Sequence, residues 1–375
     1  MGGSFCSGMN TDNTYLFKLV IAGFVWALLH AGPAWAENKY GLTTEDVFSE
    51  VYDREVVPYW QRYGKREGFT GKDDVDIQYM TFLREDEKAA VVIVNGRTES
   101  FIKYRELVYD IGKQGYSVYA YDHRGQGFSG RMTANPHMGH VDSFEDYVED
   151  LKTFVSTVVE KQNHDKLFLL SHSMGAAVAS IHIARHQADF DAAVLSSPMH
   201  TPSSGKLPSS VGCAGVTFTR SLRDFFISLL GWEPRYLLGT GDYKRPAFQG
   251  SKLTHSEVRH EKYRDIYDEH PTIQIGGPTT HWASNACKGG ELARESAADI
   301  LIPVLVLQAG DDIAVNTDGQ DEFCENINEG LRNECAGGKP HVLEGAYHEL
   351  FMEADIYRIP ALTLTLDFLE EQLED

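Results

Sequence analysis

The chain has 375 residues, of which 42% are hydrophobic, and its formal net charge is −21. This length is somewhat above the size at which one hydrophobic core stops growing, so we expect one large core with an inserted lobe. The negative charge argues against nucleic acid and anionic membrane surfaces as partners, because both would repel the protein. Contact with membrane lipid is therefore expected to be transient, and the sequence leaves the oligomeric state open.

Residues 1–36 are predicted to be an export signal and not part of the fold. Lys18 precedes an uncharged run from Leu19 to Leu29, and Ala34-Trp35-Ala36 offers a cleavage site before Glu37. This is the pattern of a secretory signal peptide, and the run is short for a transmembrane helix. We therefore expect an exported protein, periplasmic or secreted. Because the region before the apolar run has only Lys18 and the amino terminus as positive charges, the alternative is an uncleaved N-terminal membrane anchor.

The cysteines agree with export. Removal of the signal removes Cys6 and leaves an even number of cysteines, which in an oxidising compartment allow three pairings. Cys324 and Cys335 flank a short polar stretch and are expected to pair, which leaves Cys213 with Cys287. The alternative is four free, buried thiols. No two cysteines have the spacing of zinc ligands, so we predict no metal site.

Strand and helix patterns alternate between residues 89 and 198. This alternation predicts a parallel sheet whose strands are joined by right-handed crossovers. A glycine-rich loop over 122–130 is expected to be structural, because no Gly-Lys-Ser/Thr follows it, and we predict no cofactor. The predicted elements are helices over 40–63, 101–113 and 143–160 and from 175 onward, with strands over 75–81, 89–94, 116–121, 167–170 and 192–195.

The alternation stops between residues 200 and 298. This stretch has clusters of Gly, Pro and Ser and one distinct amphipathic segment. An insertion after a strand end would lie over the carboxyl edge of the sheet as a lid. Its apolar stripe would pack on the core or line an acyl-chain pocket, and the sequence does not separate these alternatives. The apolar residues of this region are Leu222, Phe225, Phe226, Leu229, Leu230 and Trp232.

The alternation resumes after the insertion, with strands predicted over 303–307 and 340–343 and helices over 319–328 and 359–373. The expected fold class is α/β, with a mostly parallel central sheet flanked by helices and an inserted, mainly helical lid. The core would consist of two parts, residues 37–199 and 299–375.

Ser173 is the predicted nucleophile. The apolar run 167–170 indicates a buried strand, and the small residues from Gly175 onward indicate a tightly packed helix start. A strand that turns sharply into a helix presents the middle side chain above the sheet and requires small residues two positions away on each side. Those positions hold Ser171 and Gly175. An ordinary strand–loop–helix join is the alternative, but it does not account for both small neighbours.

Two later loops supply a base and an acid for this serine. A serine hydroxyl needs a base to remove its proton, and the base needs an acid that holds its tautomer. The expected chain order is serine, acid, histidine. Asp311 and Asp312 follow the strand over 303–307, and both are candidates for the acid. His348 follows the strand over 340–343 and is the predicted base.

Reaction at an acyl carbonyl also needs donors for the oxyanion. The expected donors are the backbone amides of Met174, which follows the nucleophile, and of Arg97, in the loop after the strand that ends at Val94. The Arg97 side chain is expected to form a salt bridge with an acidic neighbour, and contact with a phosphate is the alternative. His172 is expected to fill space beside the site, because adjacent residues at a sharp turn point apart.

Several segments, spread over roughly residues 65–370, form a recognisable set. They are Asn95-Gly96-Arg97-Thr98-Glu99-Ser100, Asp122-His123-Arg124-Gly125-Gln126-Gly127, Ser171-His172-Ser173-Met174-Gly175, Leu253-Thr254-His255-Ser256, Gly276-Gly277-Pro278-Thr279 and Gly345-Ala346-Tyr347-His348-Glu349. In these segments the chain resembles the α/β-hydrolases of the monoacylglycerol lipase branch, and most closely its bacterial lysophospholipases. Two departures are Asn95, where many relatives have His, and Ser171, where the elbow usually has Gly.

The resemblance selects between the two candidate acids. In the family, the strand is followed by Gly or Ala, then by two intervening residues and then by the acid. Counting in this way from Ala309 gives Asp312. The implied activity is that of a serine carboxylester hydrolase acting on single-chain lipids, first of all a lysophospholipase. A monoacylglycerol lipase or a general carboxylesterase is the alternative, and a peptidase is a weaker one. From another class, a non-catalytic binding protein with the same fold remains open.

Overall fold

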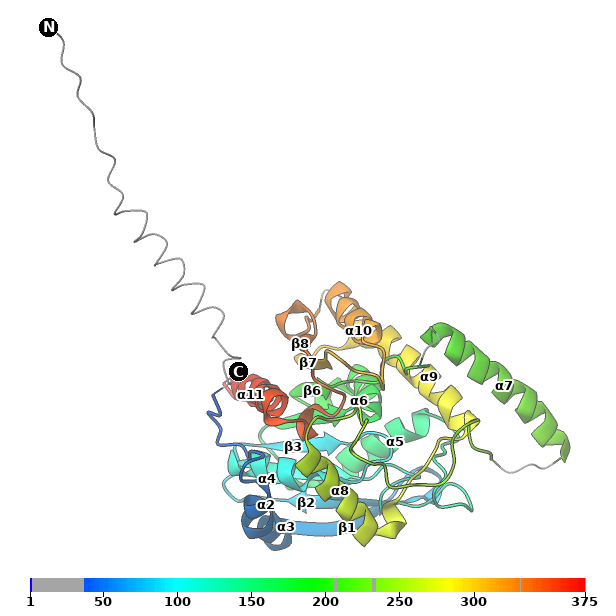
Figure 1. Cartoon of the computed structure of the whole chain (residues 1–375), viewed down its shortest axis with the longest axis horizontal. Coiled ribbons are helices and arrows are strands. Elements are labelled where there is room, and N and C mark those ends of the chain that lie inside the picture. The colour runs from blue at the N-terminus through cyan, green and yellow to red at the C-terminus, as the bar shows by residue number, and fades with distance from the viewer. Residues whose placement is uncertain (2–36, 206–207, 231–233, 331, 375) are drawn as a thin grey trace. The chain divides into compact units, whose positions relative to one another are not determined.

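The computed structural model describes residues 1, 37–205, 208–230, 234–330 and 332–374, and the side chains of 222–230 lie outside the description. In these ranges, eight strands form one sheet in the order β1-β2-β4-β3-β5-β6-β7-β8 (Figure 1). The second strand pairs antiparallel with its two neighbours, and all other pairs are parallel. The predicted α/β class with a mostly parallel sheet is thus confirmed. The strands are β1 (Gly64–Thr70), β2 (Asp76–Phe82), β3 (Ala89–Val94), β4 (Tyr116–Tyr121), β5 (Leu167–His172), β6 (Ala192–Ser196), β7 (Val304–Ala309) and β8 (His341–Leu343).

Strand β3 explains why the predicted strands are continuous apolar runs. All six of its residues are buried. Val91 and Ile93 belong to the hydrophobic cluster on one face of the sheet, and Ala90 and Val92 belong to the cluster on the other. Successive side chains of a strand point to opposite faces, so a strand covered on both sides must be apolar at every position.

Helices cover both faces of the sheet. Side chains from two sets of helices fill the two hydrophobic clusters, one on each face. The first set is α2 (Phe48–Val51), α3 (Val57–Tyr63), α4 (Arg105–Lys113), α8 (Glu257–Glu269) and α11 (Asp355–Glu371), and the second is α5 (Glu145–Phe154), α6 (Met174–Arg185), α9 (Thr280–Glu295) and α10 (Asp318–Glu329).

The segment between β6 and β7 contains helix α7 (Ser209–Leu230) in addition to α8 and α9. Figure 1 shows α7 running beside α9 at the edge of the protein. A disulfide between Cys213 and Cys287 joins the two helices, with a sulfur–sulfur distance of 2.01 Å. The predicted apolar stripe falls in α7, where the side chains of Phe225, Phe226, Leu229 and Leu230 are not described, and Trp232 lies outside the described residues.

Several elements differ from the sequence-based expectation, and helices α8 and α9 were both not predicted. Strand β1 was not predicted, because its charged residues Lys65, Arg66 and Glu67 mask any apolar alternation, as is common on an edge strand. Helix α8 was missed because most of its positions are charged. Helix α11 begins at Asp355, earlier than predicted, and carries Pro360 inside it.

A second disulfide, Cys324–Cys335, ties α10 to the segment before β8, with a sulfur–sulfur distance of 2.13 Å. Both pairs are those expected from the sequence. Among the described helices, none combines the length and the apolar character needed to cross a bilayer. The predicted signal, residues 1–36, lies almost wholly outside the described ranges.

Candidate active site

Ser173 stands at the sharp turn between β5 and α6. Its φ and ψ are 52° and −118°, a region that costs a non-glycine residue roughly 1–3 kcal/mol. Backbone hydrogen bonds hold this conformation: the Ser173 amide donates to Ser196 O at 3.0 Å, and its carbonyl accepts from Ala176 and Met199, each at 3.0 Å. The predicted elbow is therefore present, and its serine side chain is partly exposed.

The residues two positions from Ser173 show why small side chains are needed here. A Cβ atom on Gly175 would lie 2.3 Å from the carbonyl oxygen of Asn95 and 2.4 Å from that of Val94. Ser171 is buried, and its hydroxyl donates to Val194 O at 3.2 Å. The serine at the first position is thus accommodated by a hydrogen bond, whereas only glycine fits at the second.

Ser173, His348 and Asp312 form a hydrogen-bonded chain. Nε2 of His348 lies 2.9 Å from the Ser173 hydroxyl, and Nδ1 lies 2.7 Å from Oδ2 of Asp312. The Asp312 carboxylate also accepts from the amides of Ala314 at 2.8 Å and Val315 at 3.1 Å. Asp311, the other candidate acid, is exposed, and among the described residues the histidine ring has its hydrogen bond to Asp312 instead.

The charges of this chain shift the two titrating groups in opposite directions. Burial alone would raise the pKa of Asp312, but the facing His348 and two backbone amides lower it below its usual value. Burial alone would lower the pKa of His348, but Asp312, together with Glu349 and Glu99, raises it. The pair therefore favours a carboxylate that stabilises a protonated imidazole, which is what a serine nucleophile needs from its base.

His172 lies beside this chain without entering it. Its ring centroid is 4.8 Å from that of His348, and burial lowers its pKa. Its Nδ1 has no hydrogen-bond partner among the described residues.

The backbone loop after β3 faces the serine. Among the described residues, the amides of Arg97 and Met174 donate to no protein acceptor. Gln126 holds the loop: its side-chain amide donates to Gly96 O at 2.7 Å and to Glu99 O at 3.1 Å, and its oxygen accepts from Thr98 N at 3.2 Å. The glycine-rich loop that contains Gln126 therefore supports the site directly, a role that sequence reasoning missed because the contact spans separate parts of the chain.

The salt bridge expected for the Arg97 side chain is absent among the described residues. Its Nη2 donates to Gly276 O at 2.7 Å, and its guanidinium lies 4.9 Å from the ring centre of Trp282. Burial lowers the pKa of Arg97 to about 10. This expectation was wrong because the side chain turns inward, away from the acidic surface.

A buried cluster of charges lies next to the triad. The Lys103 ammonium contacts the carboxylates of Glu99 and Glu349, and Tyr104 donates to Glu99 at 2.5 Å. Donor atoms of Glu99, His172 and Glu349 lie within 4.8 Å of one another, a spacing that resembles a metal site. The Lys103 ammonium contacts both carboxylates of this group, so a cation of the protein itself already lies against them.

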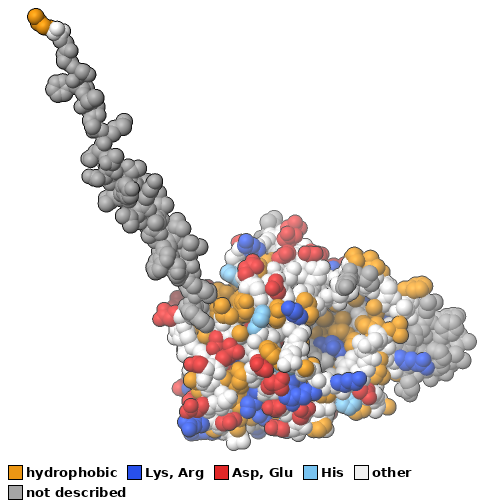
Figure 2. Space-filling view, in the orientation of Figure 1, with side chains coloured by type: hydrophobic (Ala, Val, Ile, Leu, Met, Phe, Trp, Pro, Cys, Tyr) orange, Lys and Arg blue, Asp and Glu red, His pale blue; other side chains and the backbone are white. Residues whose placement is uncertain are grey.

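Two adjoining cavities lie at this site. The first, of about 320 Å³, is lined by Ser173, His348 and Arg97, among others. The second, of about 740 Å³, is mostly apolar, lies between α7 and α9, and shares Pro202, Ser203 and Trp282 with the first. Figure 2 shows a hollow on this face with basic atoms on its floor and hydrophobic side chains around it.

Residues 85–355 match the family model described as serine aminopeptidase, S33. The chain belongs to this family. It is 36% identical over 332 residues to lysophospholipase L2 of Escherichia coli strain K12, covering 88% of this chain and 95% of that protein. It is 29% identical over 335 residues to the probable lysophospholipase L2 of Haemophilus influenzae, covering 88% and 99%.

Solved structures agree on the fold. A monoacylglycerol lipase from Paleococcus ferrophilus aligns with a TM-score of 0.56 at 20% identity, over 83% of this chain and 98% of that one. The protein is a serine hydrolase with the α/β-hydrolase fold, in the branch that holds lysophospholipases and monoacylglycerol lipases.

Proposed function

We propose that the protein hydrolyses the acyl ester of single-chain lipids, with lysophospholipids as its first substrate class. The observation that carries this proposal is the mostly apolar cavity between α7 and α9, which adjoins the cavity lined by Ser173 and suits a fatty acyl chain. The lysophospholipases among its relatives support the same substrate class. Residues 200–298 would form the lid that builds this cavity, between core parts 37–199 and 299–375.

In the proposed mechanism, Nε2 of His348 takes the proton of the Ser173 hydroxyl as its oxygen attacks the ester carbonyl. The amides of Arg97 and Met174 donate to the developing oxyanion. The protonated imidazole, held by Asp312, then gives its proton to the leaving alcohol, and an acyl-enzyme remains. Water, deprotonated by His348, attacks the acyl carbonyl, releases the fatty acid and restores the serine.

The compartment is part of the proposal. Disulfides persist mainly outside the reducing cytosol, and the structure contains two of them. Together with the signal-like pattern of residues 1–36, they support export to the periplasm or beyond.

The test compares a lysophosphatidyl substrate, a monoacylglycerol and a two-carbon ester on the purified protein. Each buried methylene adds about 0.8 kcal/mol, so kcat/KM should rise with acyl length until the cavity is full. If the two-carbon ester is the best substrate, the lipid proposal is wrong and a general carboxylesterase remains. Turnover of a peptide amide in preference to all three esters would favour a peptidase. No turnover and no labelling of Ser173 by a fluorophosphonate would favour a non-catalytic binding protein.

A further inference from the structure

Two arginines at the catalytic cavity lack the acidic partners that buried arginines elsewhere in the protein have. A buried charge is normally paired, because removing it from water is costly. Three fully buried arginines follow this rule. They are Arg124 with Asp150 at 2.6 Å, Arg259 with Glu106 at 3.0 Å and Arg358 with Asp110 at 2.8 Å.

Arg264 breaks the rule. This residue of α8 is only 6% exposed, and no carboxylate lies within ion-pair distance of it among the described residues. Its guanidinium lies 4.1 Å from the ring centre of Tyr263, and its Nε has no hydrogen-bond partner there. In a protein with 55 acidic and 34 basic residues, a buried arginine without an acid is not explained by packing alone.

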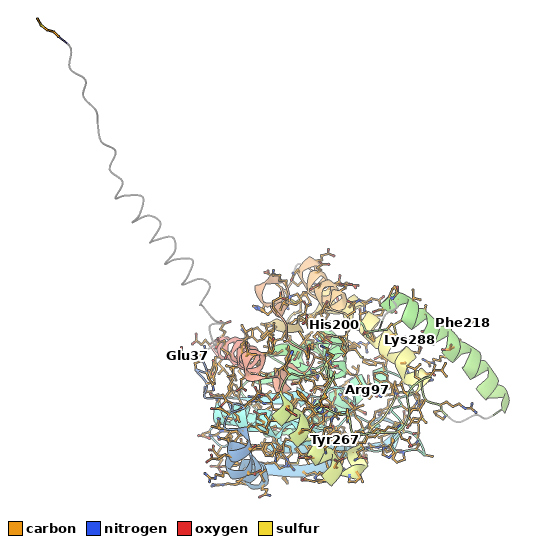
Figure 3. The ribbon with its side chains drawn as sticks, viewed as in Figure 1. Glu37, Arg97, His200, Phe218, Tyr267 and Lys288 are labelled. Carbon is orange, nitrogen blue, oxygen red and sulfur yellow. A yellow bond between two sulfur atoms is a disulfide. The ribbon has the colours of Figure 1, made fainter. Side chains whose placement is uncertain are left out.

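Arg97 is the second case. This half-buried side chain donates to Gly276 O and stacks on Trp282, but among the described residues it has no acidic partner, and its Nε has no hydrogen-bond partner. In the view of Figure 3, Arg97 lies between α8, which carries Tyr267, and α9, which carries Lys288. Arg97 and Arg264 both line the cavity that contains Ser173.

The acidic groups of this cavity contact residues other than the two arginines. Glu99 and Glu349 line it too, but the Lys103 ammonium contacts both carboxylates. The carboxylate of Asp312 is hydrogen-bonded to Nδ1 of His348. These carboxylates therefore have partners of their own, and among the described residues none of them lies within ion-pair distance of Arg97 or Arg264.

A polar cavity of about 470 Å³ continues from this side. It shares Thr98 and Arg264 with the catalytic cavity, and Lys244 lies on its wall. Asp242 also lines it, but its carboxylate accepts hydrogen bonds from Tyr236 and Asn135. The cavity lined by Ser173 thus adjoins an apolar cavity toward α7 and α9 and a separate one toward α8, which Arg264 and Lys244 line.

We propose that the guanidinium groups of Arg97 and Arg264 bind the phosphate of the lipid head group while the acyl chain occupies the apolar cavity. This inference rests on the proposed function and refines it, because it names the side chains that distinguish phosphate-bearing esters from neutral monoacylglycerols. In a lysophospholipid only the glycerol unit separates the phosphate from the ester, so an ester bound at Ser173 places its phosphate in the adjoining part of the cavity. Guanidinium groups match phosphate oxygens with charge-assisted hydrogen bonds.

The first experiment measures kcat/KM for a lysophosphatidic acid, a lysophosphatidylethanolamine and a monoacylglycerol that share one acyl chain. In Arg264→Gln, the ratio of either phospholipid to the monoacylglycerol should fall about tenfold or more, mainly through a higher KM. Arg97→Gln should shift the ratio in the same direction. The matched control is Lys262→Gln on the same helix, whose ammonium faces Asp53 at 3.6 Å and which should keep the wild-type ratio. An unchanged ratio in folded Arg264→Gln overturns the proposal.

The second experiment needs no variant of either arginine and no turnover. In Ser173→Ala protein, calorimetry should detect binding of sn-glycerol 3-phosphate, and weaker binding of inorganic phosphate, but none of glycerol. Equal binding of glycerol and glycerol 3-phosphate overturns the phosphate site. If wild-type protein hydrolyses no lipid ester but Ser173→Ala binds glycerol 3-phosphate, the proposed function fails while the phosphate site stands. If lipid esters are hydrolysed but no phosphate compound binds, only the phosphate site fails.

Discussion

The carboxylate of Glu99 accepts a hydrogen bond from the backbone amide of Gly96. Because Glu99 also contacts Lys103, the buried charge cluster is joined directly to the loop after β3, which contains Arg97 and lines the cavity of Ser173. Lys103 in turn contacts Glu349, the residue after His348. One ammonium group therefore links the loop after β3 to the loop after β8.

This link predicts that Lys103→Met is costly. The substitution leaves two carboxylates buried without their cation, so the free energy of unfolding should fall by about 3–5 kcal/mol. The matched control is Lys88→Met, because Lys88 forms an exposed pair with Glu370 that should contribute about 1 kcal/mol or less. Urea denaturation measures both. Equal small losses in the two variants would contradict the structural role of the cluster.

Ser173→Ala should lower kcat by about 10⁴ to 10⁶, the range for removal of a triad nucleophile. A fluorophosphonate should label the wild-type serine and leave the variant unlabelled. Ser171→Ala is the control, because its hydroxyl only bonds Val194 O and should leave labelling intact. Near-normal ester turnover in Ser173→Ala would refute the nucleophile.

The two adjacent carboxylates should behave differently. Asp312→Asn removes the carboxylate that faces Nδ1 of His348 and holds the imidazole in the tautomer that catalysis needs. This substitution should therefore lower kcat by about 10⁴. Asp311→Asn is the matched control and should be mild, since its side chain is exposed. Steady-state kinetics with one ester substrate compares them. The reverse ranking would assign the acid to Asp311.

The acid limb of the pH profile should report His348. The base must be neutral to accept the serine proton, so kcat/KM should rise as pH increases through the pKa of His348. That pKa is raised above the ordinary 6.5, so the half-maximum should lie above pH 6.5. In Asp312→Asn the burial effect is no longer opposed by the carboxylate, and the limb should move to lower pH. A neutral ester substrate avoids titration of the ligand, and a wild-type midpoint below pH 6.5 would contradict the assignment.

The two disulfides should differ in how much they stabilise the protein. In the loop-entropy model, the 74-residue separation of Cys213 and Cys287 corresponds to about 4 kcal/mol, against about 3 kcal/mol for the 11-residue separation of Cys324 and Cys335. Variants in which both cysteines of one bridge are replaced by serine, compared by denaturation, test this order.

Mass spectrometry of exported protein should find Glu37 at the amino terminus and no free thiols. A full-length, fully reduced chain would contradict export.

Local patterns were sufficient for the elements that form the core. Apolar runs predicted β3, β5 and β6, because a strand buried on both faces is apolar at most of its positions. The small residues around Ser173 predicted the elbow, since only a small neighbour fits beside the carbonyls of Val94 and Asn95. These properties depend on a few adjacent residues and are therefore visible in the sequence.

Tertiary structure alone decided which charged groups meet. From spacing alone, either Asp311 or Asp312 could be the acid, and the resemblance to a family favoured Asp312. In the structure, the turn after β7 directs the carboxylate of Asp312 at His348. The sequence suggested a salt bridge for Arg97, and the fold instead stacks it on Trp282, which is distant along the chain. Electrostatic partners are set by distances in space, and residues such as Arg97, Arg264 and Lys103 acquire their roles only when separate loops close around one cavity.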